Sequence, residues 1–116
     1  MQKITIINIS GEVVFQVVIA DRWIKRLFGL LLQRELSYEQ SLWLRPCRSI
    51  HTIGMHYPID VIFINRFSYV VRTVSCLPPF RLSRAPSSTH SVIELRAGSI
   101  EQFGIHIGSK VVQDSL

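Results

Sequence analysis

Apolar and polar residues alternate near the start of the chain, on both sides of Ser10-Gly11. A serine-glycine pair between two alternating runs is typical of a tight turn, and a period of two is that of a strand with one buried face. The sequence therefore predicts a first β-hairpin. Its expected inward residues are Ile4, Ile6, Val13, Phe15, Val17 and Ile19.

The apolar period changes after Asp21, a residue type that caps helix N-termini. Trp23, Leu27 and Leu30 recur at intervals of three and four residues. That spacing places them on one apolar stripe of a helix, with the basic residues of the segment toward water. We expect a short amphipathic helix over residues 22–32.

Period-two and continuous apolar runs return in the rest of the chain. The ranges expected as strands are 41–44, 59–65, 69–77, 91–96 and 110–113, with a helical turn near 99–103. The strands 59–65 and 69–77 are close enough to form a second hairpin, with Val61, Phe63 and Val71 pointing inward. The proline-rich stretch 78–86 fits neither a central strand nor a helix, and we expect it to be a mobile flap.

Strands dominate this pattern, they follow one another at hairpin distances, and no strand-helix-strand unit repeats. We therefore predict a single domain over residues 1–116 of mainly β (α+β) class. The expected architecture is an antiparallel β sandwich or partly closed barrel, with one short packed helix near residues 22–32.

Composition narrows the class of protein further. Hydrophobic residues make up 47% of the chain and charged residues 18%, which is the balance of a globular domain. No apolar run approaches the roughly 20 residues that cross a bilayer, and the first residues do not form a signal peptide. We expect a soluble cytoplasmic protein. Cys47 and Cys76 are too few to form a disulfide framework, so a bond between them is allowed but not implied.

The charge is uneven along the chain. The net charge is +5, and ten arginines contribute most of it. Seven of these arginines lie between Arg45 and Arg96, where only Asp60 and Glu94 oppose them. That half of the molecule is therefore expected to be cationic.

Four sequence motifs resemble those of a known family, domain of unknown function family 192, also called uncharacterised protein family 0127. They follow one another in the family's order over roughly residues 13–112: Arg26-Leu27-Phe28-Gly29-Leu30-Leu31; Ile50-His51-Thr52-Ile53-Gly54-Met55; Pro58-Ile59-Asp60-Val61-Ile62-Phe63-Ile64; and Glu94-Leu95-Arg96-Ala97-Gly98 with Gly104-Ile105 and Gly108. The resemblance implies a small, mainly β fold with a helix after the first strands. No enzyme activity or cofactor is established for that family.

The chain departs from the family pattern at several positions. Leu31 stands where methionine is common, and Ser109 stands where aspartate is common. Many members carry tryptophan-methionine-lysine-asparagine-threonine in the region of residues 50–55, and a role for the missing tryptophan or lysine does not transfer. Thr52, Pro58 and Asp60 fit the shared pattern.

Polar and soft side chains gather just before the apolar strand that begins at residue 59, and such a cluster is a candidate ligand site. We expect His51, Thr52 and Asp60 to orient a small or extended polar or anionic ligand, which the protein binds without transforming it. The other expected contacts are apolar, from Met55, Tyr57 and Trp43, and ionic, from Arg81 or Arg84 closing over an anion. Nothing in the pattern indicates a cofactor.

Asp60 has two interpretations. A carboxylate within an apolar strand needs hydrogen bonds or a cationic partner. In the first, the carboxylate accepts hydrogen bonds from backbone or threonine donors and stabilises the turn at Tyr57-Pro58. In the second, it orients His51 or an arginine over a pocket.

Three other functions stay open. Cys47, His51 and Met55, at intervals of four, are soft ligands for copper or zinc, although no histidine precedes His51 to complete a blue-copper set. Cys47, His51 and Asp60 are also the residue types of a cysteine-histidine hydrolase. The arginines, with aromatic residues for stacking, allow nucleic-acid binding. No pattern specifies an oligomeric state.

Overall fold

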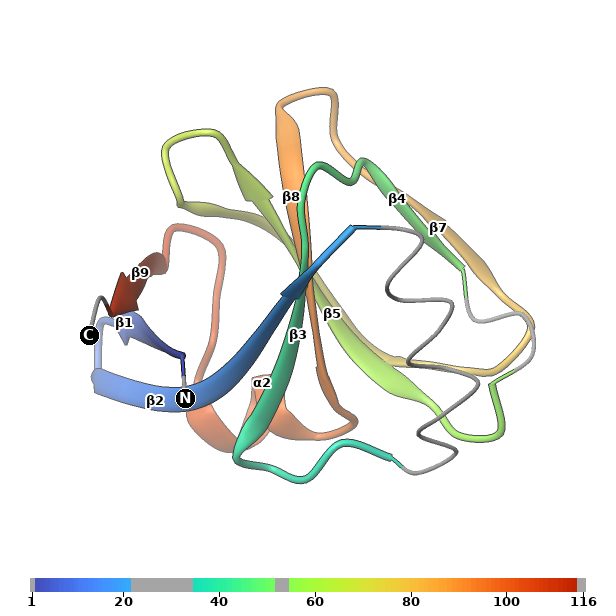
Figure 1. The fold of residues 1–116 in the computed structure, drawn as a ribbon, viewed down its shortest axis with the longest axis horizontal. Coiled ribbons are helices and arrows are strands. Elements are labelled where there is room, and N and C mark those ends of the chain that lie inside the picture. Colours follow the sequence, from blue (N-terminus) through green and yellow to red (C-terminus); the bar gives the residue numbers. More distant parts are fainter. Residues whose placement is uncertain (1, 22–34, 52–54, 115–116) are drawn as a thin grey trace.

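The computed structural model of the protein describes residues 2–21, 35–51 and 55–114. In this part the chain forms a curled sheet with one short helix (Figure 1). The elements are β1 (Lys3–Asn8), β2 (Gly11–Ala20), β3 (Gln40–Leu44), β4 (Ser49–His51), β5 (Ile59–Asn65), β6 (Val70–Leu77), β7 (Leu82–Arg84), β8 (Thr89–Arg96), α2 (Ser99–Phe103) and β9 (Lys110–Asp114). The predicted helix 22–32 lies outside the described residues. No helix of the described part is long and apolar enough to cross a membrane.

Seven strands form the main sheet, in the order β6-β5-β8-β3-β2-β1-β9. Neighbouring strands are antiparallel except β2 and β3, which run parallel. The two edge strands approach each other where they begin: Tyr69 bridges to Lys110, and the Val70 amide donates to the Ser109 carbonyl at 2.9 Å. The sheet therefore curls into a half-barrel, which confirms the predicted mainly β fold with a partly closed barrel.

The concave face of the sheet encloses the larger core. Alternating residues of the first hairpin point into it as predicted, with Ile4, Ile6, Phe15 and Val17 buried and Val13 and Ile19 packed against them. Helix α2, predicted near residues 99–103, contributes Ile100, and the Phe103 ring meets the Phe15 ring edge-on at 5.5 Å. Gly98 and Gly104 flank this helix with φ angles of 96° and 66°, a left-handed backbone that glycine adopts without a steric cost.

A second core lies on the other face of the same sheet. Val61 and Phe63 of β5 point into it, while Ile62 and Ile64 point into the barrel. Residues next to the separate two-stranded sheet of β4 and β7 complete this outer cluster: Cys47, Met55, Tyr57 and Ala85. Strand β5 is buried on both faces, which explains why its sequence is a continuous apolar run.

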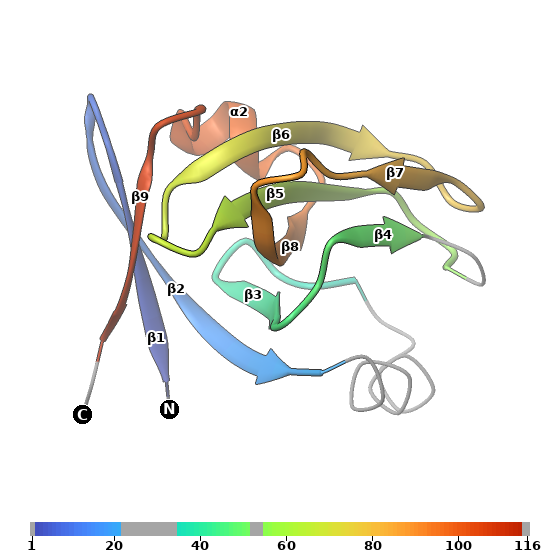
Figure 2. The ribbon, with the colours of Figure 1, turned by 90° about the horizontal axis from the view of Figure 1, so that it is seen from above.

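The stretch 78–86 contains a short strand that the sequence did not predict. Residues 82–84 form β7 and pair antiparallel with β4, with Ser49 opposite Arg84 and His51 opposite Leu82. Three residues are too few to show a period of two, and flanking prolines mask the pattern. Figure 2 shows β4 and β7 side by side, with β5 behind them.

Candidate functional site

Asp60 is fully buried at the start of β5, and its carboxylate accepts three backbone hydrogen bonds. Oδ1 accepts from the Cys76 amide at 2.8 Å, and Oδ2 accepts from the amides of Gly98 at 3.1 Å and Ile100 at 2.8 Å. Bonds of this type to an ionised oxygen are about twice as strong as neutral ones. The carboxylate thus joins β5 to β6 and to the start of α2.

This geometry matches the interpretation of Asp60 as an acceptor of backbone hydrogen bonds, although the donors differ from those expected. Its donors are backbone amides, as in that interpretation, but they belong to β6 and to the start of α2 instead of the turn at Tyr57-Pro58. They are distant in sequence, which is why a local motif did not reveal them.

Trp43 is buried in the barrel core, and its indole Nε1 donates to the Ser91 hydroxyl at 2.9 Å. Met55 and Tyr57 are half-buried against the outer cluster. Trp43 therefore lies on the opposite face of the sheet from Met55 and Tyr57. The structure does not bring these three apolar contacts of the expected pocket together.

His51 is placed only by its backbone, which pairs with Leu82 at the end of β4. Its side chain and Thr52 lie outside the described residues. Cys47 is buried and Cys76 is exposed, and no disulfide joins them. Among the described residues no three histidine, cysteine, aspartate or glutamate side chains gather as metal ligands. Since the His51 imidazole is not among them, the metal and hydrolase hypotheses stay predictions.

Glu94 is a buried acid that the sequence-based site did not include. It lies on β8, opposite Val61 of β5 and Leu42 of β3. A charge within the apolar run Val92-Ile93-Glu94-Leu95 is the signal that singles it out. Glu94 also affects Tyr57. Burial raises the pKa of the Tyr57 phenol, and the negative charges of Glu94 and Glu35 raise this pKa further.

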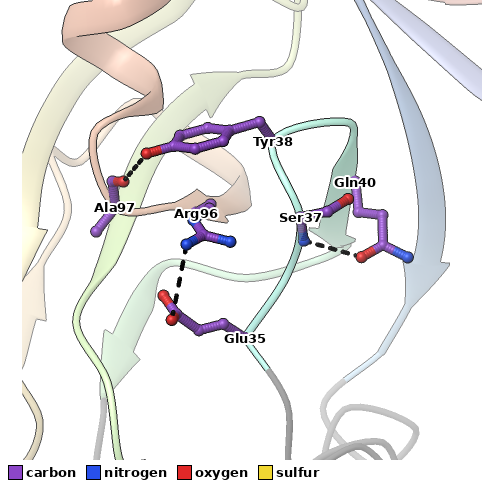
Figure 3. Close-up of polar contacts among 6 residues, drawn as sticks. All are labelled: Glu35, Ser37, Tyr38, Gln40, Arg96 and Ala97. Carbon is purple, nitrogen blue, oxygen red and sulfur yellow. Dashed lines mark hydrogen bonds and ion pairs between the residues drawn. The ribbon is translucent and has the colours of Figure 1, made fainter.

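Side chains at the end of β8 contact the segment before β3 (Figure 3). The Arg96 guanidinium lies 4.0 Å from the Glu35 carboxylate and 4.7 Å from the centre of the Tyr38 ring. The Tyr38 hydroxyl donates to the Ala97 carbonyl at 3.5 Å. The Arg96 side chain thus contacts both Glu35 and Tyr38.

The raised pKa of Tyr57 predicts that the stability of the fold depends on pH. A raised pKa in the folded protein means that the native state holds the phenolic proton more tightly than the unfolded chain does. The stabilisation is therefore complete below the unfolded value of 10.0 and is lost as the pH rises through the folded value. Titration of tyrosinate absorbance should show a step above pH 10 that disappears in Tyr57→Phe and moves to lower pH in Glu35→Gln. A step unchanged in Tyr57→Phe would contradict the assignment.

The arginine face is the exposed surface around β4 and β7 that carries Arg48, Arg72, Arg81 and Arg84. Two of these side chains hold the 78–88 segment: Arg48 Nη2 donates to the Ser87 carbonyl at 3.0 Å, and Arg72 Nη1 donates to the Arg84 carbonyl at 3.1 Å. A guanidinium has five N–H donors, so one such bond leaves others for a ligand.

Negative charge is missing from the surface that this half of the chain presents. Asp60 and Glu94 are its only acids between residues 45 and 96, and both are buried. Four of the seven arginines of this half, Arg48, Arg72, Arg81 and Arg84, lie around β4 and β7. Sequence reasoning singled out Arg81 and Arg84 but not Arg48 and Arg72. The β4-β7 pairing brings Arg48 near this segment, and a hydrogen bond to the Arg84 carbonyl brings Arg72 there.

A partly closed barrel of this strand order, with a small two-stranded sheet beside it, defines a mainly β domain class. The chain belongs to the domain of unknown function 192 family, described as "Uncharacterized ACR", whose sequence profile matches residues 5–113. This shows that the resemblance found in the sequence was correct.

Two curated relatives come from archaea. A UPF0127 protein of Pyrococcus furiosus is 30% identical over 103 residues, covering 86% of this chain and 88% of its own length. A UPF0127 protein of Pyrococcus abyssi is 34% identical over 111 residues, covering 91% of this chain and 94% of its own length.

Two solved structures share the fold. A protein of unknown function from Novosphingobium aromaticivorans superposes with a TM-score of 0.83 at 24% identity, over 95% of this chain and 83% of that one. A protein named as a candidate transcription regulator from Sinorhizobium meliloti gives a TM-score of 0.84 at 18% identity, over 97% and 92% of the two chains. At these identities the likeness shows the fold alone.

Proposed function

We propose that this protein is a non-catalytic module that binds a small or extended anionic ligand on the arginine face. The observation that carries the proposal is the charge of that surface: four exposed arginines surround one short sheet, and the only acids of the same half of the chain are buried. Clustered cations concentrate anionic ligands and speed their association. A cytoplasmic location belongs to this proposal.

The arrangement favours recognition of phosphate or carboxylate groups. Arginine presents paired N–H donors in a plane, which match two oxygens of one anion. Arg84 lies on β7, and Arg48 lies next to β4, the strand that pairs with it. Because backbone pairing fixes these two strands, the arginines start from a defined spacing and need less ordering when a ligand binds.

Titration with two anionic probes, inorganic pyrophosphate and single-stranded oligodeoxythymidylate, tests the proposal. We expect binding at low salt, since screening weakens exposed charge interactions as the salt concentration rises. The double variant Arg81→Gln/Arg84→Gln should bind more weakly. With the oligonucleotide, its slope of log affinity against log salt should be smaller by about 1.4, because each lost phosphate contact removes about 0.7.

Arg66→Gln is the matched control. Arg66 is also exposed, but it lies in the loop between β5 and β6, with its guanidinium 4.8 Å from the centre of the Phe67 ring. This variant removes one positive charge, half of what the double variant removes, without touching the arginine face. Binding of pyrophosphate alone would indicate a small ligand, and binding of the oligonucleotide an extended one. Absence of binding to both probes, or an equal loss in Arg66→Gln, would refute the proposal.

A further inference from the structure

Two large apolar side chains project into solvent beside the arginine face. Phe80 is 65% exposed and Leu82 is 62% exposed, and Arg81 lies between them in the sequence. We call residues 80–82 the Phe80 tip. It follows the rigid pair Pro78-Pro79 and leads directly into β7. An aromatic and an aliphatic residue exposed within three positions form a local apolar feature on a cationic surface.

The backbone at Phe80 is in a disfavoured conformation. Its φ angle is 61°, in the left-handed region that bulky residues rarely adopt. Burial of the ring does not offset this strain, because most of the side chain is in solvent. Strain of this kind at an exposed position points to a role outside the folding of the chain.

We propose that the Phe80 tip docks on the surface of an anionic lipid bilayer. In this inference, which rests on the proposed function of the arginine face, Phe80 and Leu82 enter the boundary between headgroups and acyl chains. Arg81 and Arg84 contact the lipid phosphates. Apolar insertion together with basic residues is the general way in which proteins bind reversibly to anionic membranes.

The direction of the side chains on β7 supports this arrangement. Ser83 is buried, whereas Leu82 and Arg84 on either side of it are exposed. Because side chains alternate along a strand, Leu82 and Arg84 lie on the same outer face. One apolar and one cationic group thus point the same way from a strand that the pairing with β4 holds in place.

A lipid surface fits this tip better than a nucleic acid does. Bases stack on aromatic rings, so Phe80 could serve either partner, but the aliphatic Leu82 has no π-face. An apolar boundary accepts both side chains. The charge is complementary, since no exposed acid of residues 45–96 would repel anionic headgroups.

The test measures binding of the full chain to vesicles of phosphatidylcholine with and without phosphatidylserine, by sedimentation. We expect binding only to the vesicles that contain phosphatidylserine. Phe80→Asn should weaken it about tenfold, since the apolar contact is lost. Asparagine tolerates a positive φ angle, so this variant should fold at least as stably as the natural chain. Leu82→Thr should act in the same direction and suits a strand.

Phe67→Asn is the matched control. Phe67 is 60% exposed and follows Arg66, but it lies at the opposite end of the β5-β6 hairpin. Its replacement should leave vesicle binding unchanged. If Phe67→Asn and Phe80→Asn weaken binding equally, the tip has no special role and the inference is wrong.

The oligonucleotide titration separates this inference from the proposed function. If the protein binds the oligonucleotide but not the vesicles, or if Phe80→Asn weakens both equally, the membrane inference is refuted while the arginine face remains an anion-binding surface. If Phe80→Asn weakens only vesicle binding, the inference is supported. If pyrophosphate, the oligonucleotide and the vesicles all fail to bind, both proposals are refuted.

Discussion

Replacing Asp60 with alanine should lower the free energy of unfolding by about 3–5 kcal/mol, because three backbone amides would lose an acceptor that is itself fully buried. The three donors are the amides of Cys76, Gly98 and Ile100. Since these donors come from β6 and from the start of α2, the loss weakens the connection of β5 to both elements. Urea denaturation followed by tryptophan fluorescence measures the loss.

Asp114→Ala is the control for this prediction. Asp114 is half-buried at the end of β9 and accepts from the Thr5 hydroxyl at 3.4 Å. Its loss should cost less than about 1 kcal/mol, as is usual for a partly exposed hydrogen bond. Should Asp60→Ala instead keep its stability and lose pyrophosphate binding, the carboxylate would belong to a ligand site and its assigned structural role would be wrong.

Phe63→Ala should be comparably damaging, at about 3–5 kcal/mol, because it removes a ring that is completely buried in the outer cluster. Phe63 lies in the middle of β5, the strand covered on both faces. Truncation would therefore leave a cavity that the neighbouring strands cannot fill. Phe67→Ala removes the same ring from an exposed loop and should change stability by about 0.5 kcal/mol or less.

The same pair of variants tests whether a ligand pocket reaches the outer face of β5. A ring that lines an open, water-filled hollow already contacts solvent, so its removal creates little new cavity. A loss below about 1 kcal/mol in Phe63→Ala would therefore argue for such a hollow. The expected large loss would mean that this face is a packed core, and that ligands bind at the surface around β4 and β7.

The strands were predictable because their signal is local. Alternation around Ser10-Gly11 identified the first hairpin, and the apolar run from Ile59 identified the doubly covered β5. β4 and β7 were not predicted, since each has three residues and is held by pairing with the other. Short strands depend on a partner that local sequence does not specify.

The expected site was predicted less well than the fold. Trp43 and Tyr57 were expected to share one pocket, yet β3 turns Trp43 into the barrel while Tyr57 packs against the outer cluster. Which face a residue occupies depends on the register of its strand within the sheet, and a shift of one residue reverses it. The positions of such residues relative to one another therefore required the tertiary structure.

By itself the sequence determined the mainly β class, most of the strands, the family and the cationic character of residues 45–96. These properties follow from side-chain period, motif order and charge, all of which are local or additive along the chain. The tertiary structure alone decided that the sheet curls until β6 meets β9, that Asp60 binds amides far away in the sequence, and that the arginines surround β4 and β7. Each of these depends on contacts between distant segments, whose geometry is fixed only when the whole sheet has formed.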